Sequence, residues 1–223
     1  MSITLPNSHG KDKKADNFLS DNTKNLLIIF TRNPVLGKCK TRLATTVGDQ
    51  VALDIYKLLL NHTFAITKEL QVHKQVYYSN EICEDDIWDS SIFDKHLQQG
   101  ADLGERMANA FRNGFKDGFE NIIIIGSDIY DLTLFDLQEA FEALIQNEFV
   151  IGPAEDGGYY LLGMKRFNET VFMDKTWGKE NVFKDTMEDL KNEQIVLLSS
   201  KNDIDVYDDV KDIEAFQPYL KNI

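Results

Sequence analysis

The chain has 223 residues, a length that fits one α/β domain or two small domains. Hydrophobic residues make up 43% of the chain and aromatic residues 11%, which is enough to build a buried core and excludes wholesale disorder. The formal net charge of −13 at pH 7 argues against a protein that grips nucleic acid through a broad basic surface. This charge is still compatible with a small anionic ligand where positive charge is concentrated locally.

The sequence pattern does not indicate a signal peptide, a membrane span or a disulfide framework. Residues 1–24 are polar and lack the apolar segment of a signal peptide, so we expect a flexible polar tail before a single domain at 25–223. No stretch approaches the ~20 consecutive apolar residues of a membrane span. Cys39 and Cys83 lie in neither a CxxC pair nor a zinc-like spacing, which indicates two reduced thiols. We therefore expect a cytoplasmic protein without a membrane span.

Strand-like and helix-like segments alternate from residue 25 onward. The first is the continuous apolar run NLLIIFT, typical of a strand buried on both faces, and residues 32–44 are predicted to form the loop after it. Asp102 and Thr133 are predicted helix N-caps, and residues 81–94 an irregular or briefly helical crossover. The predicted strands are 25–31, 75–79, 121–126, 149–153, 159–164 and 194–199, and the predicted helices are 49–70, 102–117, 133–145, 177–191 and 208–219.

This alternation predicts an α/β fold with a mostly parallel sheet flanked by helices. The strands at 149–153 and 159–164 are separated only by AEDGG, which indicates a hairpin or a sharp bend. Ligands of such sheets bind beyond the carboxyl ends of the strands. Two polar clusters, at 32–42 and 127–131, lie at those ends.

Positive charge is concentrated in the predicted loop at 32–44. Clustered cations, a glycine that lets the backbone approach and a threonine hydroxyl together suit a di- or triphosphate. The loop is not a P-loop, because Cys39 follows the lysine where that motif has Ser or Thr, and no GxGxxG is present. A solvated basic loop without a ligand is the alternative interpretation. The residues concerned are Arg32, Gly37, Lys38, Lys40, Thr41 and Arg42.

Carboxylates form three further clusters. Asp128 follows the isoleucine-rich strand and is well placed to bind a divalent cation that bridges phosphates, although it could instead cap the next turn. The turn at 155–158 offers two carboxylates beside two glycines, and an ordinary hairpin turn is its alternative. Near the C-terminus, acidic residues that are mostly solvated or capping could include one that completes a site with Asp128. They are Asp203, Asp205, Asp208 and Asp209.

Three ordered segments, 30–43, 126–133 and 152–163, resemble a bacterial family of GT-A-fold, nucleotide-diphospho-sugar-transferase-like proteins. They are similar to CofC-type 2-phospho-lactate guanylyltransferases and, more distantly, to molybdopterin guanylyltransferases. The resemblance covers about 25–216. It implies a three-layer α/β/α, Rossmann-like GT-A fold and an enzyme that acts on a nucleotide.

The resemblance also implies roles for individual residues. Asp128 and Asp205 would hold Mg²⁺ or Mn²⁺, with Asp203 as the alternative second ligand. Catalysis would rest on Lys40, Arg42 and Asp128. The acceptor side would be lined by Glu155, Asp156, Gly157, Gly158 and Tyr159. The nucleotide would be bound by Arg32, Pro34, Gly37, Lys38, Lys40, Thr41, Arg42 and Ser127.

Three functions follow from these assignments. The leading hypothesis is a Mg²⁺-dependent nucleotidyltransferase that moves a nucleotidyl group from an NTP to a small phosphorylated acceptor and releases pyrophosphate. The alternative is a glycosyltransferase with an NDP-sugar donor, for which Asp156 or Glu155 would act as base. A third is a nucleotide-binding protein without catalysis. In each case the partner is a small nucleotide and not a nucleic acid.

Overall fold

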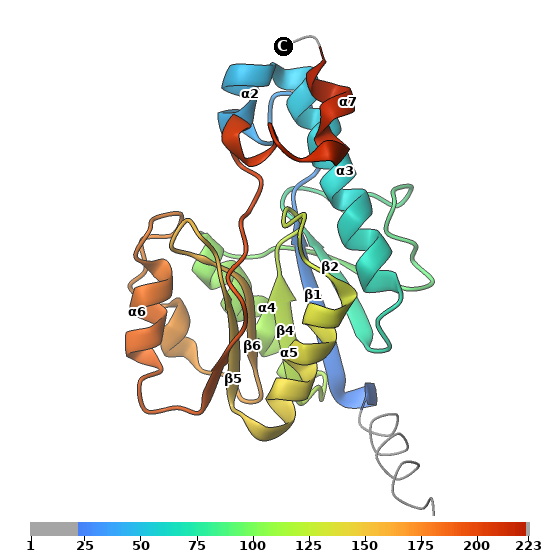
Figure 1. The fold of residues 1–223 in the computed structure, drawn as a ribbon. Helices are drawn as coiled ribbons and strands as arrows, with labels where there is room; N and C mark the ends of the chain where they lie inside the picture. Colours follow the sequence, from blue (N-terminus) through green and yellow to red (C-terminus); the bar gives the residue numbers. More distant parts are fainter. Residues whose placement is uncertain (1–21, 222–223) are drawn as a thin grey trace, which may run out of the picture.

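The computed structural model describes residues 22–221, and its centre is a seven-stranded sheet in the order β3-β2-β1-β4-β6-β5-β7 (Figure 1). All neighbouring strands are parallel except β6, which runs antiparallel to both β4 and β5. The mostly parallel α/β sheet and the hairpin of β5 and β6 are therefore confirmed. The strands are β1 (Asn25–Thr31), β2 (His73–Tyr78), β3 (Asp94–Leu97), β4 (Asn121–Ile125), β5 (Phe149–Pro153), β6 (Tyr159–Met164) and β7 (Ile195–Leu197).

Helices cover both faces of this sheet. In Figure 1, α4 lies behind the sheet and α5 in front of it, which gives the three layers expected. The C-terminal segment packs against α2 and α3 at one end of the molecule. The helices are α2 (Thr41–Val47), α3 (Asp49–Lys68), α4 (Leu103–Lys116), α5 (Leu134–Gln146), α6 (Val182–Asp189) and α7 (Gln217–Leu220), with short 3-10 segments at Asn22–Lys24, Glu169–Phe172, Tyr207–Asp209 and Glu214–Phe216.

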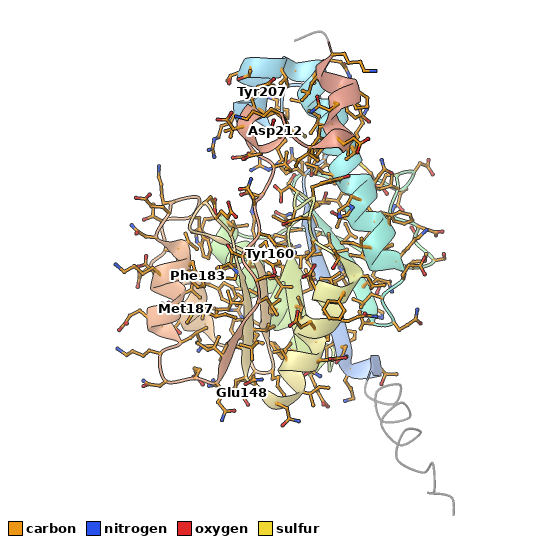
Figure 2. All side chains as sticks on the ribbon, viewed as in Figure 1. Glu148, Tyr160, Phe183, Met187, Tyr207 and Asp212 are labelled. Carbon is orange, nitrogen blue, oxygen red and sulfur yellow. The ribbon has the colours of Figure 1, made fainter. Side chains whose placement is uncertain are left out.

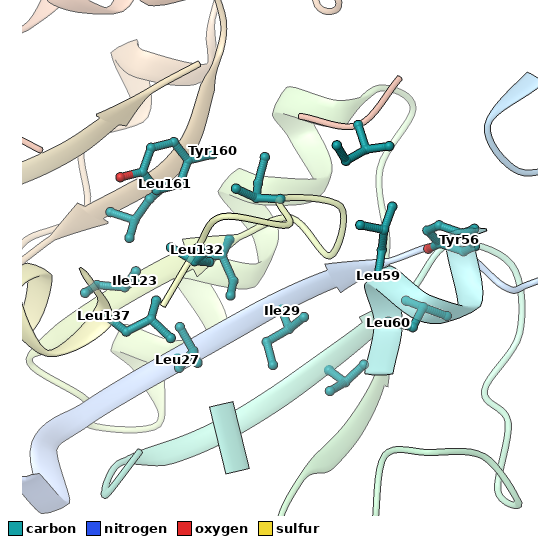
Figure 3. Close-up of a cluster of buried hydrophobic side chains, with 14 of the residues drawn as sticks. Leu27, Ile29, Tyr56, Leu59, Leu60, Ile123, Leu132, Leu137, Tyr160 and Leu161 are labelled. Carbon is teal, nitrogen blue, oxygen red and sulfur yellow. The ribbon is translucent and has the colours of Figure 1, made fainter. Parts of the chain in front are cut away.

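The two faces of the sheet build two hydrophobic cores. Successive side chains of a strand point to opposite faces, so Leu27 of β1 joins one core and Leu26 the other. Leu27 lies beside Ile123 of β4, and both contribute to the core shown in Figure 3. There α3 contributes Leu59 and α5 contributes Leu137, in agreement with the helical spacing of the sequence.

Two helix starts follow the sequence signals closely. The Asp102 side chain accepts a hydrogen bond from the Glu105 backbone N–H at 2.8 Å and caps α4. At the start of α5, Thr133 and Asp136 form a reciprocal capping box, with the Asp136 backbone N–H donating to Thr133 Oγ1 at 3.2 Å. Both predicted N-caps are confirmed.

Four predicted elements differ from the structure. The segment 81–94 is predicted to be an irregular or briefly helical crossover, but the strand β3 begins at Asp94. Its sequence DKHL lacks the apolar alternation of a strand, because β3 is an edge strand. Residues 32–44 were predicted to be a loop throughout, but α2 begins at Thr41. The helix predicted over 177–191 begins only at Val182, because turns occupy the residues before it.

The single helix predicted over 208–219 is broken into three short pieces. The side chain of Asp209 accepts hydrogen bonds from the backbone N–H groups of Asp205 and Val206, which closes a tight 3-10 turn. Pro218 in the first turn of α7 supplies no N–H that could continue a helix from before it. Figure 2 shows Tyr207 and Asp212 of this segment at the end of the molecule formed by α2 and α3, and Phe183 and Met187 along α6.

Two sequence expectations concern whole-chain properties. No helix within 22–221 is both long and apolar enough to cross a membrane. Cys39 is buried, Cys83 is half-buried, and both are free thiols. The polar tail predicted at 1–24 falls almost entirely outside the described residues, apart from the short 3-10 segment Asn22–Lys24.

Candidate functional site

A cavity of about 850 Å³ opens beyond the carboxyl ends of β1 and β4. Its volume is in the range of small-molecule sites. Of the residues predicted to bind a nucleotide, Pro34 and Gly37 belong to the adjoining loop and do not line the cavity. The structure brings the others together: the wall includes Arg32, Lys38, Lys40, Thr41, Arg42, Ser127, Asp128 and Asp205, and also Asn33, Tyr56, Asn80, Gln98 and Arg106.

The loop after β1 is anchored by a buried asparagine. The Asn33 side chain donates to the Glu81 carbonyl at 2.8 Å and accepts from the Asn80 backbone N–H at 3.1 Å. The Cys39 thiol donates to the Asn33 carbonyl at 3.2 Å. Gly37 has a φ of 70°, the left-handed conformation that a glycine adopts without strain. These contacts anchor the loop beside the cavity.

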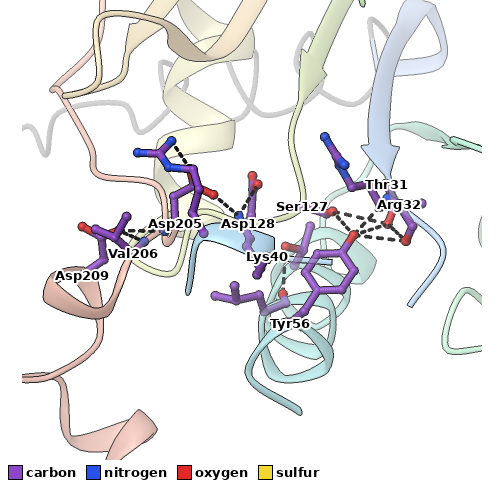
Figure 4. Close-up of polar contacts among 12 residues, drawn as sticks. Thr31, Arg32, Lys40, Tyr56, Ser127, Asp128, Asp205, Val206 and Asp209 are labelled. Atoms are coloured by element: carbon purple, nitrogen blue, oxygen red, sulfur yellow. Dashed lines mark hydrogen bonds and ion pairs between the residues drawn. The ribbon is translucent and has the colours of Figure 1, made fainter. Parts of the chain in front are cut away.

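The hydroxyl of Tyr56 on α3 connects the two strand ends. It accepts a hydrogen bond from the Arg32 backbone N–H at 2.9 Å and lies 3.1 Å from the Arg32 carbonyl (Figure 4). Its distances to Thr31 Oγ1 and Ser127 Oγ are 3.3 and 3.4 Å. Burial of the phenol raises the pKa of Tyr56, so this group stays protonated. Tyr56 therefore fixes the start of the basic loop relative to the loop after β4.

Lys40 lies between the two aspartates predicted to bind metal. Its ammonium is 2.8 Å from Asp128 Oδ2 and 3.6 Å from Asp205 Oδ1, and Arg42 also pairs with Asp205 (Figure 4). Lys40 has the left-handed backbone angles φ 47° and ψ 46°, a conformation that costs a lysine about 1 to 2 kcal/mol. The Lys40 ammonium contacts the carboxylates of Asp128 and Asp205, whereas the sequence predicted a contact with phosphates.

The electrostatics of this cluster follow from burial and close pairing. Burial opposes charge on Lys40, but Asp128 and Asp205 outweigh it, and the pKa of Lys40 is raised. Burial likewise opposes charge on Asp128, yet Lys40 lowers the pKa of Asp128 below its usual value. Burial, with Asp128 and Asp156 nearby, raises the pKa of Asp203 to about 6. The raised pKa of Lys40 and the lowered pKa of Asp128 therefore favour a charged pair at this point of the cavity.

The fit of a divalent cation can be judged from the same carboxylates. Among residues 22–221 no three His, Cys, Asp or Glu side chains are arranged to hold a metal by themselves. Asp128 and Asp205 nevertheless converge on one cation, the Lys40 ammonium, and carboxylate oxygens are the ligands that Mg²⁺ prefers. Because Mg²⁺ is commonly held by one or two carboxylates plus substrate phosphates, this donor set fits the ion only together with a nucleotide.

A second cavity, of about 210 Å³, adjoins the first and shares Asp128 with it. Of the predicted acceptor-side residues, Asp156, Gly158 and Tyr159 line it, whereas Glu155 is exposed and does not. Gly157 is also outside the wall but shapes it: its φ is 89°, and a Cβ there would lie 2.2 Å from the Glu180 carbonyl oxygen.

Sequence reasoning missed several polar residues of the larger cavity, among them two on helices. Tyr56 and Arg106 both sit on helices whose apolar spacing drew attention to packing and not to chemistry. Arg106 Nε donates to the Gly100 carbonyl at 3.1 Å, which orients the side chain along the cavity wall. The sequence signal that could have pointed to Arg106 is its position directly before Met107, a buried residue of α4.

The protein has the fold of nucleotide-diphospho-sugar transferases. A candidate nucleotide-diphospho-sugar transferase from Desulfovibrio desulfuricans G20 is 28% identical over 89% of this chain and 94% of that chain, with a TM-score of 0.79. 4-Diphosphocytidyl-2C-methyl-D-erythritol synthase from Anaerococcus prevotii DSM 20548 covers 92% and 100% at 10% identity and a TM-score of 0.58. CMP:2-keto-3-deoxy-manno-octonic acid synthetase, solved in complex with CTP, covers 90% and 100% at 7% identity and a TM-score of 0.56.

The sequence comparison identifies the family. The model of a family described as an uncharacterised protein conserved in bacteria, DUF2064, matches residues 62–179, just over half of the chain, and the protein belongs to this family. The resemblance noted from the three sequence segments is confirmed at this level. The comparison with curated proteins found no match. The structural neighbours named above are transferases, and the two at 10% identity or less share the fold alone.

Proposed function

We propose that the protein is a Mg²⁺-dependent nucleotidyltransferase that uses an NTP and releases pyrophosphate on transfer to a small acceptor. The observation that carries this proposal is the concentration of basic side chains in one cavity of an acidic protein. Arg32, Lys38 and Arg106 line the larger cavity, and none of them pairs with a carboxylate among residues 22–221. Three cations that form no direct ion pair at one site favour a ligand with several negative charges.

The residues around the cavity suit separate parts of a nucleoside triphosphate. Arg32 and Lys38, in the loop after β1, are placed to neutralise the charge that develops on the leaving phosphates. Mg²⁺, with Asp128 and Asp205 as its protein ligands, would neutralise phosphate oxygens when bound. The side-chain amide of Asn80 lies on the same wall and is available to a base or ribose, whereas the Gln98 amide already donates to the Thr31 and Tyr77 carbonyls at 3.3 and 3.0 Å.

The proposed reaction forms one bond and breaks one. An acceptor oxygen attacks the α-phosphorus, the bond from that phosphorus to the oxygen bridging the β-phosphate breaks, and pyrophosphate leaves with the electron pair. Any proton on the acceptor oxygen leaves for solvent or for a carboxylate of the smaller cavity. Because transfer depends mainly on position and charge, the scarcity of histidine near the site is consistent with this chemistry.

Glycosyl transfer is the second function that an observation supports. The neighbour at 28% identity is described as a candidate nucleotide-diphospho-sugar transferase, and an NDP-sugar would place two phosphates in the same basic cavity. In that reaction the bond at the anomeric carbon breaks and an NDP leaves. The two functions therefore differ in the product: pyrophosphate in one case, a nucleoside diphosphate in the other.

The test measures both products in parallel. The full chain is incubated with Mg²⁺, a small-molecule extract of bacteria as acceptor source, and either each NTP or a panel of NDP-sugars. We expect pyrophosphate release with at least one NTP. The KM for that NTP should rise about tenfold in Lys38→Ala, which loses a charge-assisted contact. It should stay unchanged in Lys57→Ala, because Lys57 is an exposed residue of α3. NDP release without pyrophosphate would select glycosyl transfer, and binding without any turnover would select a non-catalytic protein.

A further inference from the structure

The smaller cavity has a mostly apolar wall. It is enclosed by Leu103 and Met107 of α4, Ile124 of β4 and Val182 of α6, and it opens toward the larger cavity beside Asp128. Its volume of about 210 Å³ exceeds the roughly 150 Å³ of an apolar protein cavity that admits benzene. The space therefore accommodates a body the size of one six-membered ring with a short substituent.

Two aromatic residues complete the wall. Trp177 meets Tyr159 edge to face, with ring centroids 6.5 Å apart and an interplanar angle of 90°. The indole lies directly on Gly104 of α4, where an added Cβ would be 2.5 Å from the indole nitrogen. The buried Tyr159 hydroxyl has no hydrogen-bond partner. Because this hydroxyl is buried, Tyr159 contributes its ring to the wall of the cavity.

Charge divides the two cavities. The basic residues Arg32, Lys38 and Arg106 line the larger cavity, and none of them lines the smaller one. In the smaller cavity Asp156 and Asp203 face a single basic residue, Lys179. The remaining carboxylate there, Asp128, is already paired with Lys40. A phosphate or carboxylate would thus enter a cavity with excess negative charge, where like charges repel.

From this wall we propose that the smaller cavity takes the acceptor, and that the acceptor is a ring-sized, largely apolar molecule with a hydroxyl group and no anionic group. The inference rests on the proposed function and gives it a substrate class. It also departs from the phosphorylated acceptor expected from the sequence, because the cations that such a group needs line the other cavity. The apolar wall, with the rings of Tyr159 and Trp177, holds the ring of the acceptor, and the acceptor's hydroxyl is the attacking oxygen of the proposed reaction.

The test compares probes that share one carbon skeleton. Benzyl alcohol, benzoate and benzyl phosphate are titrated against the full chain by ligand-observed NMR, and NTP binding is measured by calorimetry on the same preparation. We expect benzyl alcohol to bind at least about tenfold more tightly than either anion, because both anions meet unpaired carboxylates. Leu103→Ala removes part of the apolar wall and should weaken benzyl alcohol binding severalfold with little change in melting temperature, because this side chain is 43% exposed in the free protein.

Two further variants isolate the charge. Asp156→Asn keeps an oxygen that can accept from the Gly158 backbone N–H, so the turn is preserved, and it should narrow the preference for the alcohol over benzoate by about fivefold. Glu142→Gln makes the same change in net charge on an exposed position of α5, which packs on the other face of the sheet, and should leave the preference unaltered.

The outcomes separate this inference from the proposed function. Tighter binding of benzyl phosphate or benzoate, or a Leu103→Ala variant that binds the alcohol as the wild type does, would overturn the acceptor class even if NTP binding is intact. Absence of NTP binding would refute the proposed function and with it the acceptor role of the cavity.

Discussion

Replacing Lys40 by Met removes one ammonium and nearly nothing else. Met has a similar length, and it would occupy the same left-handed backbone conformation, so the strain at φ 47° is common to both proteins. The substitution leaves Asp128 and Asp205 without their shared cation. The stability difference between the two proteins therefore reports on the ammonium itself.

The expected loss can be worked out from the geometry of the pair. Attraction across 2.8 Å amounts to about 6 kcal/mol at an effective dielectric constant of about 20. Much of it is offset by desolvation, because the Lys40 side chain is only 6% exposed. Asp128 is 35% exposed, so water stabilises part of the charge left behind. We expect a net loss of about 2 kcal/mol, or about 4 to 8 °C in melting temperature for a chain of this size.

The assay is thermal unfolding with and without Mg²⁺. Without Mg²⁺ the Lys40→Met variant should melt below the wild type. With Mg²⁺ the variant should gain more than the wild type, because its two aspartates no longer hold an internal cation that competes with the ion. Equal stability of the two proteins without Mg²⁺ would refute the importance of the pair. Equal stabilisation by Mg²⁺ would refute the assignment of these aspartates as ligands.

Two other predictions concern the architecture around the site. Gly157→Ala should lower the free energy of unfolding in urea by at least about 2 kcal/mol, because the added Cβ would lie 2.2 Å from the Glu180 carbonyl oxygen. Gly178→Ala places its Cβ in open space and should lower it by only about 1 kcal/mol, the cost of its positive φ. Equal losses in the two variants would refute the contact at Gly157. Burial opposes charge on Asp136, but hydrogen bonds from Thr133 outweigh it and lower the pKa of Asp136. The ionised Asp136 carboxylate therefore stabilises the fold above about pH 4, and this stabilisation is lost at lower pH. The difference in unfolding free energy between the wild type and Asp136→Asn should shrink between about pH 5 and pH 2. A difference that stays constant over this range would contradict the reasoning.

The sequence predicted the fold best where one physical signal dominates. The run 122–125 consists of isoleucines because both faces of β4 are buried there, and the start of α5 is set by a local capping box. Prediction from the sequence failed where contacts between distant parts of the chain determine the secondary structure. The edge strand β3 has no apolar alternation of its own and forms by pairing with β2. The helix predicted over 208–219 is broken by backbone hydrogen bonds to Asp209.

The candidate site shows the same division. Loop position and residue type were sufficient to group Lys38 and Arg42 around one cavity. No sequence pattern indicates that Lys40 turns inward to Asp128, because that depends on its left-handed backbone and on contacts between residues 88 positions apart. The same holds for the Tyr159 hydroxyl, whose lack of a partner is a property of the packed molecule.

Nucleotide binding in the larger cavity is the central claim, and calorimetry tests it most directly. The full chain is titrated with CTP, GTP, ATP, UTP and UDP-glucose, each with and without Mg²⁺. We predict that at least one NTP binds, that Mg²⁺ strengthens the binding, and that Lys38→Ala weakens it while Lys57→Ala does not. Failure of every NTP to bind, or binding that is indifferent to both Mg²⁺ and Lys38, would contradict the account.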